Sequence, residues 1–252
     1  MARLFDRPQR TWPGLKRRAL LLIGLASAVF GAEADPGYYL VRPYAAAGKS
    51  SLDLRYWSVQ APGEAALLWP ELGLRHGFSE RWTSEILLSW IGPGWRSQKL
   101  SSLNWMNQWL LSSPDSEHEL ALHTQLIHNR GRHAGTALEI GPSWQGDWGL
   151  SRLNLNLLLE HDWARREGTQ LKLQWQVSRP LQPGLRLGLQ GFGELGRWNH
   201  WLPAARQSQR AGPMLHWVPE GQQGLSFNAA YLWGRTYGRR GDMFSAQLLL
   251  DF

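Results

Sequence analysis

One pattern recurs along most of the chain: segments of about ten residues alternate apolar and polar side chains, and turn residues separate the segments. One of them reads LNLNLLLE, residues 153–160, with leucine at every odd position. Such alternation places apolar side chains on one face of a β-strand and polar side chains on the other. The pattern predicts an all-β chain. The expected strands are 50–60, 66–77, 82–90, 100–111, 118–128, 134–145, 149–160, 169–178, 184–195, 209–218, 223–234 and 242–252.

The alternation by itself fits two folds. A soluble β-sandwich buries the apolar face and exposes the polar face to water. An outer-membrane β-barrel turns its apolar face to lipid and lines its lumen with the polar face. Periodicity cannot separate the two folds, so the choice depends on the N-terminus, the tryptophans and the last strand.

The N-terminus has the three parts of a secretory signal peptide. Residues 1–18 are basic, residues 19–31 read ALLLIGLASAVFG, and Ala32 and Ala34 follow as small residues at a cleavage site. The apolar run is short for a membrane-spanning helix, which is the alternative interpretation. We therefore expect residues 1–34 to be cleaved and the chain to be exported.

Export also accounts for part of the charge and suits the absence of cysteine. Residues 1–34 carry six Lys or Arg and two acidic residues, so their removal lowers the formal net charge from +7 to +3. The remaining charge gives no indication of nucleic-acid binding. The chain has no Cys, which excludes disulfides, thiol catalysis and cysteine metal sites.

Tryptophan is unusually frequent, with 16 residues, and many lie near the ends of predicted strands. Aromatic rings at strand ends are typical of barrels, where they occupy the headgroup level of the membrane. Only Trp69, Trp105 and Trp175 fit the middle of a strand better. The strand-end residues are Trp57, Trp82, Trp90, Trp144, Trp148, Trp163, Trp217 and Trp233.

The chain ends in FSAQLLLDF, residues 244–252, on a bare aromatic residue and in mid-alternation. The alternation has one exception, Leu249. The pattern resembles the last strand of outer-membrane barrels, which the assembly machinery reads and which closes the barrel against the first strand. A closed barrel leaves no free strand edge. The expected assembly signal comprises Phe244, Leu248, Leu250 and Phe252.

We expect about twelve antiparallel strands in an up-and-down transmembrane β-barrel over residues 50–252, after a periplasmic N-terminal segment, 35–49. An even strand count puts both termini in the periplasm, together with the short turns. The long connection around 196–209 then lies outside, as long loops do in such barrels. Because 35–49 and 196–209 are ambiguous, ten or fourteen strands remain open.

The outer loops of this arrangement are rich in arginine. Guanidinium groups pair well with phosphate, and the outer leaflet is rich in lipopolysaccharide phosphate. The plain interpretation is surface charge for solubility. The alternatives are contacts to lipopolysaccharide or attraction of anionic solutes. The lipopolysaccharide-contact candidates are Arg130, Arg132, Arg165, Arg166, Arg239 and Arg240.

The stretch LLWPELGLRHGFSERWTSEILLSW, residues 67–90, contains the most specific turn, Gly-Phe-Ser-Glu-Arg-Trp between two strands. It resembles a turn in uncharacterised proteobacterial outer-membrane proteins, including transporter-like barrels associated with aromatic-degradation operons. The resemblance implies a porin-like outer-membrane barrel over about 50–252. It implies no particular substrate and no functional residues.

The alternation also predicts which ionisable residues face the lumen. They could form a cross-lumen ion-pair network that makes the barrel rigid, or line a narrow channel for a small solute. The lumen-lining candidates are Glu71, Arg75, Glu85, Glu119, His123, Glu139, Lys172 and Arg186. The same parity also places Asp53, Arg55, Glu160, Glu194, His216 and Asp251 inside.

Enzyme activity and bound cofactors find little support. A lipid hydrolase needs a serine beside an activating histidine. No His-x-Ser pattern lies on a predicted strand, and His128 and His161 have no serine at that spacing. The histidines are scattered, so no metal or other cofactor is expected. The favoured function is passage of a small solute. The alternatives are a non-conducting structural or interaction barrel of the cell envelope and, last, a lipid hydrolase.

Overall fold

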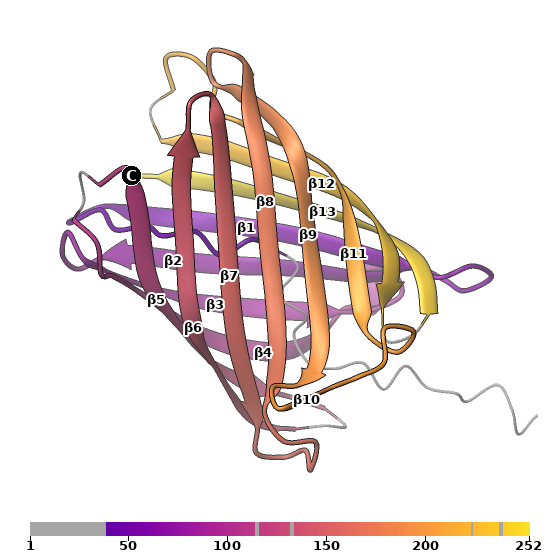
Figure 1. Ribbon diagram of the computed structural model, residues 1–252. Coiled ribbons are helices and arrows are strands. Elements are labelled where there is room, and N and C mark those ends of the chain that lie inside the picture. The colour runs from indigo at the N-terminus through magenta and orange to yellow at the C-terminus, as the bar shows by residue number, and fades with distance from the viewer. Residues whose placement is uncertain (1–38, 114–115, 132–133, 223, 237–238) are drawn as a thin grey trace, which may run out of the picture. The chain divides into compact units, whose positions relative to one another are not determined.

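The computed structural model describes residues 39–113, 116–131, 134–222, 224–236 and 239–252. In these ranges the chain forms a closed antiparallel β-barrel of twelve long strands (Figure 1). One 3-10 turn, Trp95–Ser97 (η1), is the helical element of the described residues, and none of their helices is long and apolar enough to cross a membrane. The strands are β1 (Ser50–Gln60), β2 (Leu67–Gly77), β3 (Trp82–Ile91), β4 (Lys99–Leu110), β5 (His118–Asn129), β6 (Gly135–Trp148), β7 (Ser151–Asp162), β8 (Gln170–Gln182), β9 (Leu185–Arg197), β10 (His200–Trp201), β11 (Ser208–Trp217), β12 (Leu225–Thr236) and β13 (Arg239–Asp251).

Each long strand pairs with its neighbours along the chain, and β13 pairs with β1 to close the barrel. The closing register runs from Ser51 opposite Asp251 to Gln60 opposite Asp242. The two-residue strand β10 pairs only with the end of β9, so it adds no strand to the wall. The predicted closed barrel of about twelve strands is confirmed.

Two turns differ clearly from the prediction: β8, expected to end at 178, continues to Gln182, and the turn between β6 and β7 is displaced. The sequence predicted a turn at 146–148, but β6 continues to Trp148 and the turn is formed by Gly149 and Leu150. Gly149 has a φ of +57°, which glycine adopts without steric cost and which suits a two-residue hairpin. The extension brings Asp147 opposite Arg152 on β7.

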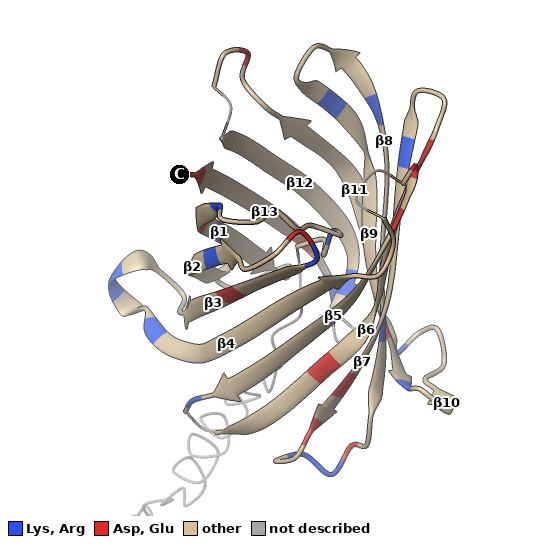
Figure 2. Ribbon diagram, turned by 90° about the vertical axis from the view of Figure 1, so that its left-hand side faces the viewer, with Lys and Arg blue, Asp and Glu red and all other residues tan. Residues whose placement is uncertain are grey.

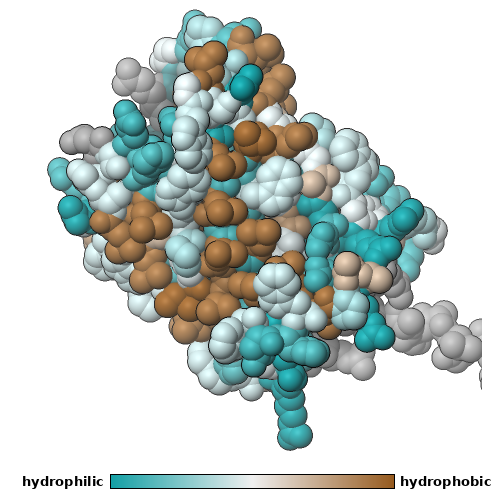
Figure 3. Space-filling view, viewed as in Figure 1, coloured by the Kyte–Doolittle hydropathy of each residue, from teal (hydrophilic) through white to brown (hydrophobic). Residues whose placement is uncertain are grey.

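The outer face of the barrel is apolar. Leu74, Ile86 and Leu189 are 58%, 56% and 50% exposed in mid-strand positions, where a soluble protein would bury them. Figure 3 shows apolar residues gathered over the middle of the face formed by β7, β8 and β9, with hydrophilic residues toward the loops. A closed barrel with such a face satisfies the backbone in lipid and suits a transmembrane position.

The inner face is polar and closely packed. Asp53, Asn104, His123, Asn154 and Asn156 are fully buried although all are polar or charged. Acidic and basic positions therefore occur along the strands as well as in the loops and turns (Figure 2). The alternation has the inside-out sense of a membrane barrel, in which the polar parity points inward.

The placement of one tryptophan was predicted wrongly. Trp57 was expected at the headgroup level, but its side chain is only 2% exposed and stacks on Trp69 inside the lumen, with ring centroids 4.3 Å apart. The reason is parity, because Trp57 shares the inward face of β1 with Asp53 and Arg55. Trp148, Trp163, Trp217 and Trp233 are 45–60% exposed.

Candidate functional site

The lumen contains a cavity of about 400 Å³ on the side of the barrel where the chain ends. Its wall comes from the inward faces of β1–β9 and β11–β13, and its floor from an N-terminal segment, residues 39–44, that runs inside the barrel. The ionisable residues at its border are Arg42, Tyr39, Tyr44, Arg55, Arg75, Glu85, Glu119, Arg152, Arg186, His216 and Asp251.

The N-terminal segment is held at its backbone by lumen side chains. The Val41 N–H donates to Gln174 Oε1 at 3.0 Å, and Asn156 Nδ2 donates to the Val41 carbonyl at 2.8 Å. Ser143 Oγ donates to the same carbonyl at 3.3 Å. Val41 is 5% exposed, so the segment is packed against the wall and not free in the lumen. The sequence pattern did not predict this occupancy of the lumen by part of the segment 35–49.

Val41 and its partners lie between two separate cavities of the lumen. A second cavity of about 160 Å³ lies toward the connections β7–β8 and β9–β11 and is lined by Glu160 and Lys172, among others. It shares no lining residue with the first cavity. On β8, Gln174 lies between Lys172 and the first cavity, and it is 2% exposed and bound to Val41. The segment and its partners therefore narrow the path between the two cavities.

Arg42 projects from the segment toward β8 and β12. Its Nη2 donates to Asn228 Oδ1 at 2.8 Å and to Gln176 Oε1 at 3.3 Å. Burial, together with the positive charges of Arg152 and Arg186, lowers the pKa of Arg42 to about 10. The guanidinium still carries its charge at neutral pH, where it is partnered by neutral amides.

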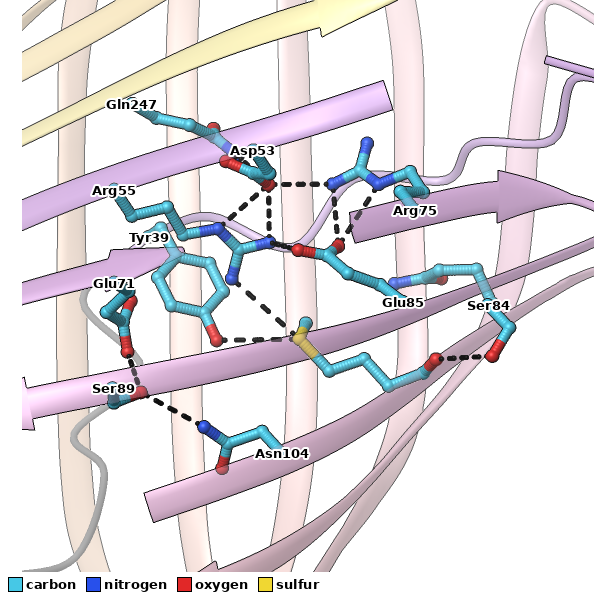
Figure 4. Close-up of polar contacts among 12 residues, drawn as sticks. Tyr39, Asp53, Arg55, Glu71, Arg75, Ser84, Glu85, Ser89, Asn104 and Gln247 are labelled. Carbon is cyan, nitrogen blue, oxygen red and sulfur yellow. Dashed lines mark hydrogen bonds and ion pairs between the residues drawn. The ribbon is translucent and has the colours of Figure 1, made fainter. Parts of the chain in front are cut away.

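A four-residue ion cluster lies on β1, β2 and β3 beside the segment (Figure 4). Asp53 accepts from Arg55 at 2.7 Å and from Arg75 at 3.1 Å, and Glu85 accepts from the same two guanidiniums at 2.8 and 2.9 Å. The cluster contains two positive and two negative side chains. Gln247 on β13 adds a bond to Asp53 at 2.8 Å. Charges buried in this way need complete pairing, and here they have it.

Aromatic rings of the N-terminal segment cover this cluster. The Tyr39 ring stacks on Arg55, with the guanidinium carbon 3.7 Å from the ring centroid. The guanidinium carbon of Arg75 lies 5.4 Å from the centroid of the Tyr44 ring. Cation–π contacts of this kind strengthen as water is excluded. The cluster thus anchors the segment as well as the strands.

A second ion cluster lies on β5–β8. Lys172 Nζ donates to Glu139 at 2.9 Å and also contacts Glu160. His123 Nε2 lies 3.4 Å from the Glu139 carboxylate, and Gln108 bonds the other ring nitrogen of His123 at 3.0 Å. All of these groups except Gln108 are buried. The cluster connects four neighbouring strands through side chains as well as through the backbone.

Another part of the lumen wall is apolar, next to an ion pair at 2.8 Å between Arg210 on β11 and Glu194 on β9. The Trp57–Trp69 stack packs with buried side chains from β9 and β11–β13 in one cluster. This part of the lumen is filled by side chains and carries no charge. The other members of the cluster are Phe192, Met214, Ala230, Leu232 and Met243.

All eight predicted lumen candidates lie on the inner face. Five of them belong to the two ion clusters, and the other three lie apart from these clusters. Arg75 and Glu85 belong to the first ion cluster, and His123, Glu139 and Lys172 to the second. Glu71 is buried and accepts from Ser89 at 2.6 Å. Glu119 and Arg186 line the cavity of about 400 Å³.

Sequence reasoning missed the residues of the N-terminal segment and the amides that hold it. Tyr39, Val41 and Arg42 lie in a stretch without a period-two pattern, so no signal marked them. Gln174 and Asn156 lie on the polar face of their strands. That face alone indicated that they point inward but not what they bind.

The lipopolysaccharide candidates are dispersed over two loops and the start of β13. Arg130, Arg166 and Arg240 are exposed, whereas Arg165 pairs with Asp162 at 3.2 Å. Arg132 and the side chain of Arg239 lie outside the described residues. So does the predicted signal peptide. Within the described ranges, no group of three or more His, Asp or Glu is placed to hold a metal ion.

No protein-family model matches the sequence, and no curated protein matches it. Solved structures do. An outer membrane channel from Pseudomonas putida F1 aligns with a TM-score of 0.60 at 12% identity, covering 87% of this chain and 100% of that one.

Two porins align nearly as well. The NanC porin gives a TM-score of 0.57 at 9% identity and covers 79% of this chain and 98% of its own. The KdgM porin gives 0.57 at 9% identity and covers 80% and 99%. At these identities the likeness is one of fold, and the chain has the architecture of outer-membrane channel barrels.

Proposed function

We propose that this protein is a narrow outer-membrane channel for the passive or facilitated passage of a small solute. The observation that carries the proposal is the lumen: a closed barrel with an apolar exterior encloses a polar cavity of about 400 Å³. A cavity of that size suits a small molecule. The solved channel and porins with the same fold support the proposal.

The N-terminal segment sets the width of the proposed path. Val41 and its amide partners occupy the lumen between the two cavities. The side chains of Gln174, Asn156 and Ser143 hold the backbone of Val41 by hydrogen bonds. Displacement of residues 39–44 would join the two cavities into a wider passage.

A second candidate is a non-conducting barrel with a structural or interaction role in the envelope. The observation that favours it is the same occupancy of the lumen by residues 39–44, together with the two ion clusters that connect neighbouring strands. The two functions differ in whether solute crosses the barrel, so one measurement separates them.

The test is single-channel conductance of the refolded mature chain in planar bilayers, beside a variant that lacks residues 39–44. We expect small steps for the wild type and larger steps for the variant, because the constriction is removed. Deletion of residues 62–64 in the exposed β1–β2 loop is the control and should leave the conductance unchanged. Silence of both correctly folded barrels would contradict the channel and favour the structural role.

Finer parts of the proposal concern the partners. We propose that the exposed arginines of the outer loops contact lipopolysaccharide, which the loss of lipopolysaccharide co-purification in an R130Q/R240Q variant would test. We also propose that β13 is read by the barrel-assembly machinery. The outward-facing Phe244 and the terminal Phe252 support this, and a slower assembly of F252A in cells would test it.

Two further predictions from the sequence belong here. We propose that the protein is not an enzyme, and a phospholipid hydrolysis assay on the refolded barrel should show no activity. We also propose a relationship to the transporter-like barrels of aromatic-degradation operons, which the turn in 67–90 resembles without implying a particular substrate. Uptake of labelled benzoate by cells with and without the protein tests whether that relationship extends to transport of an aromatic compound.

A further inference from the structure

One wall of the cavity of about 400 Å³ carries positive charges that the neighbouring carboxylates do not fully balance. Arg42 from the N-terminal segment, Arg152 from β7 and Arg186 from β9 all border the cavity. Within the described residues, neither Arg42 nor Arg186 forms an ion pair with a carboxylate. Arg42 donates to two amides, and Arg186 donates to Ser178 Oγ at 3.2 Å and to backbone carbonyls.

Arg152 is the third member of this wall, and it has one carboxylate partner. It binds Asp147 at 2.8 Å, and both side chains are partly exposed, at 38% and 47%. The pair is bidentate, with hydrogen bonds of 2.8 Å from both Nε and Nη2 of Arg152. Because it is solvated, it holds Arg152 less firmly than the buried pairs of the first ion cluster hold their guanidiniums. Arg42, Arg152 and Arg186 are called the arginine wall below.

The first ion cluster is a useful comparison, because its charges lie in the same lumen and have only a structural role. There, each of two guanidiniums meets two carboxylates, and the charges balance. The arginine wall lacks this balance although it borders the same cavity. Its charges also act on one another, because Arg152 and Arg186 contribute to the lowered pKa of Arg42. A bound anion would relieve that repulsion.

The acidic residues at the cavity border offset the charge of the wall only in part, because Glu119 acts on Arg152 but not on Arg42 or Arg186. Glu85 is paired within the first ion cluster. Glu119 accepts from Gln145 at 2.8 Å, and Asp251 accepts from Ser51 at 2.7 Å. Glu119 comes from β5, and Asp251 comes from β13, beyond β12. The border is therefore divided into acidic positions on those strands and a basic side made by β7, β9 and the N-terminal segment.

Neutral hydrogen-bonding groups lie between the arginines. Gln176 and Ser178 on β8 and His216 on β11 border the cavity beside them. The Nδ1 of His216 lies 2.8 Å from Asn228 Oδ1, the oxygen that also accepts from Arg42. Guanidiniums flanked by amide and hydroxyl groups suit a carboxylate, which accepts several hydrogen bonds at once.

We propose that the arginine wall is a binding site for a small organic anion bearing carboxylate groups, and that such anions are the substrate class of the channel. The assignment of a transported substrate rests on the proposed function, whereas the binding site itself does not. Binding in such a path must be weak enough to allow release, so a low-affinity site is expected.

The test measures binding without conductance. Isothermal titration calorimetry of succinate into the detergent-solubilised, folded mature chain should show saturable binding. R186Q and R42Q should each weaken it about tenfold or more, because each removes charge-assisted hydrogen bonds. The matched control is R179Q, since Arg179 lies next to Ser178 on β8 but is exposed and outside the cavity.

Two comparisons test whether the binding depends on charge and whether the variants disturb the N-terminal segment. Succinamide, the neutral analogue, should bind at least tenfold more weakly than succinate if charge carries the recognition. R186Q leaves the bonds of Arg42 to Gln176 and Asn228 in place, so it separates loss of the site from displacement of the N-terminal segment. Folding of each variant is checked by heat-modifiable mobility on gels.

The site would be contradicted by absent or non-saturable succinate binding, by equal binding of succinamide, or by R186Q binding like R179Q. Single-channel recording then tests the channel separately. Succinate binding to a barrel that never conducts would keep the anion site and contradict the channel. Conductance without any succinate binding would keep the channel and contradict the anion site.

Discussion

Single charged side chains are stable in the lumen only when partners replace the water that they lose. Asp53 shows this most clearly, since it is fully buried and accepts from two guanidiniums and an amide. Asp147 is the opposite case, because its pair with Arg152 is half in solvent. The same kind of ion pair therefore contributes differently to the free energy of unfolding at the two positions.

This difference predicts the outcome of two matched substitutions. D53N should lower the free energy of unfolding by about 3–5 kcal/mol, because it leaves two buried guanidiniums short of a carboxylate. D147N should change it by less than about 1 kcal/mol. Urea unfolding in phospholipid vesicles measures both. Equal effects of the two variants would show that the first ion cluster does not stabilise the barrel.

Among the strands, β1 and β13 have the decisive part, because their pairing removes the last free edge of the sheet. The register places Leu54 opposite Leu248, and both side chains face outward. A shift by one residue would turn the apolar side chains of β13 into the lumen and Gln247 into lipid. The register is therefore specified because the polar side chains of β13 must face the lumen and its apolar side chains must face lipid.

A cysteine-free chain allows this register to be tested directly. The double variant L54C/L248C should form a disulfide on mild oxidation, since directly opposed residues have the Cα separation that a disulfide needs. L54C/A246C is the out-of-register control and should crosslink poorly, because its residues are diagonal neighbours. Mobility on non-reducing gels reports both. Preferential crosslinking of the control would mean that the barrel closes in another register.

The N-terminal segment is held differently from any strand. Residues 39–44 pair with no strand, and their bonds run to side chains such as Gln174 and Asn156, more than 100 positions away along the chain. An element held in this way can leave the lumen without breaking the backbone ladder of the wall. That property makes it suited to control the width of the path.

Considered as one body, the barrel is apolar outside and polar inside, so its stability depends on the membrane. Leu157 lies near the middle of β7 and is 45% exposed, whereas Leu150 lies in the turn before β7 and is 73% exposed. Only the first of these positions should lie in the hydrocarbon layer.

The placement in the membrane predicts a depth-dependent cost. L157R should lower the free energy of unfolding in phospholipid vesicles by about 2–4 kcal/mol, while L150R should lower it by about 0–1 kcal/mol, as for arginine near the interface. Denaturant titration of both variants gives the comparison. A small effect of L157R, equal to that of L150R, would contradict a membrane-spanning wall on this side.

The barrel wall could be derived from the order of amino acids alone. Period-two alternation, turn residues and the final aromatic predicted the strands, their count and the closure of β13 on β1, because each of these signals is local or repeated. Where the prediction failed, at the 146–148 turn, the end of β8 and Trp57, the local signal was ambiguous about a boundary or about which face a tryptophan occupies.

The contents of the lumen depended on three-dimensional packing. Parity indicated that Glu85 and Arg186 point inward, but only the folded barrel pairs Glu85 with Arg55 and Arg75 and leaves Arg186 beside neutral groups. The occupancy of the lumen by Val41 and Arg42 had no sequence signal. The physical reason is that a strand's alternation is dictated by its two environments, whereas contacts across the lumen join residues that are distant along the chain and meet only once the barrel has closed.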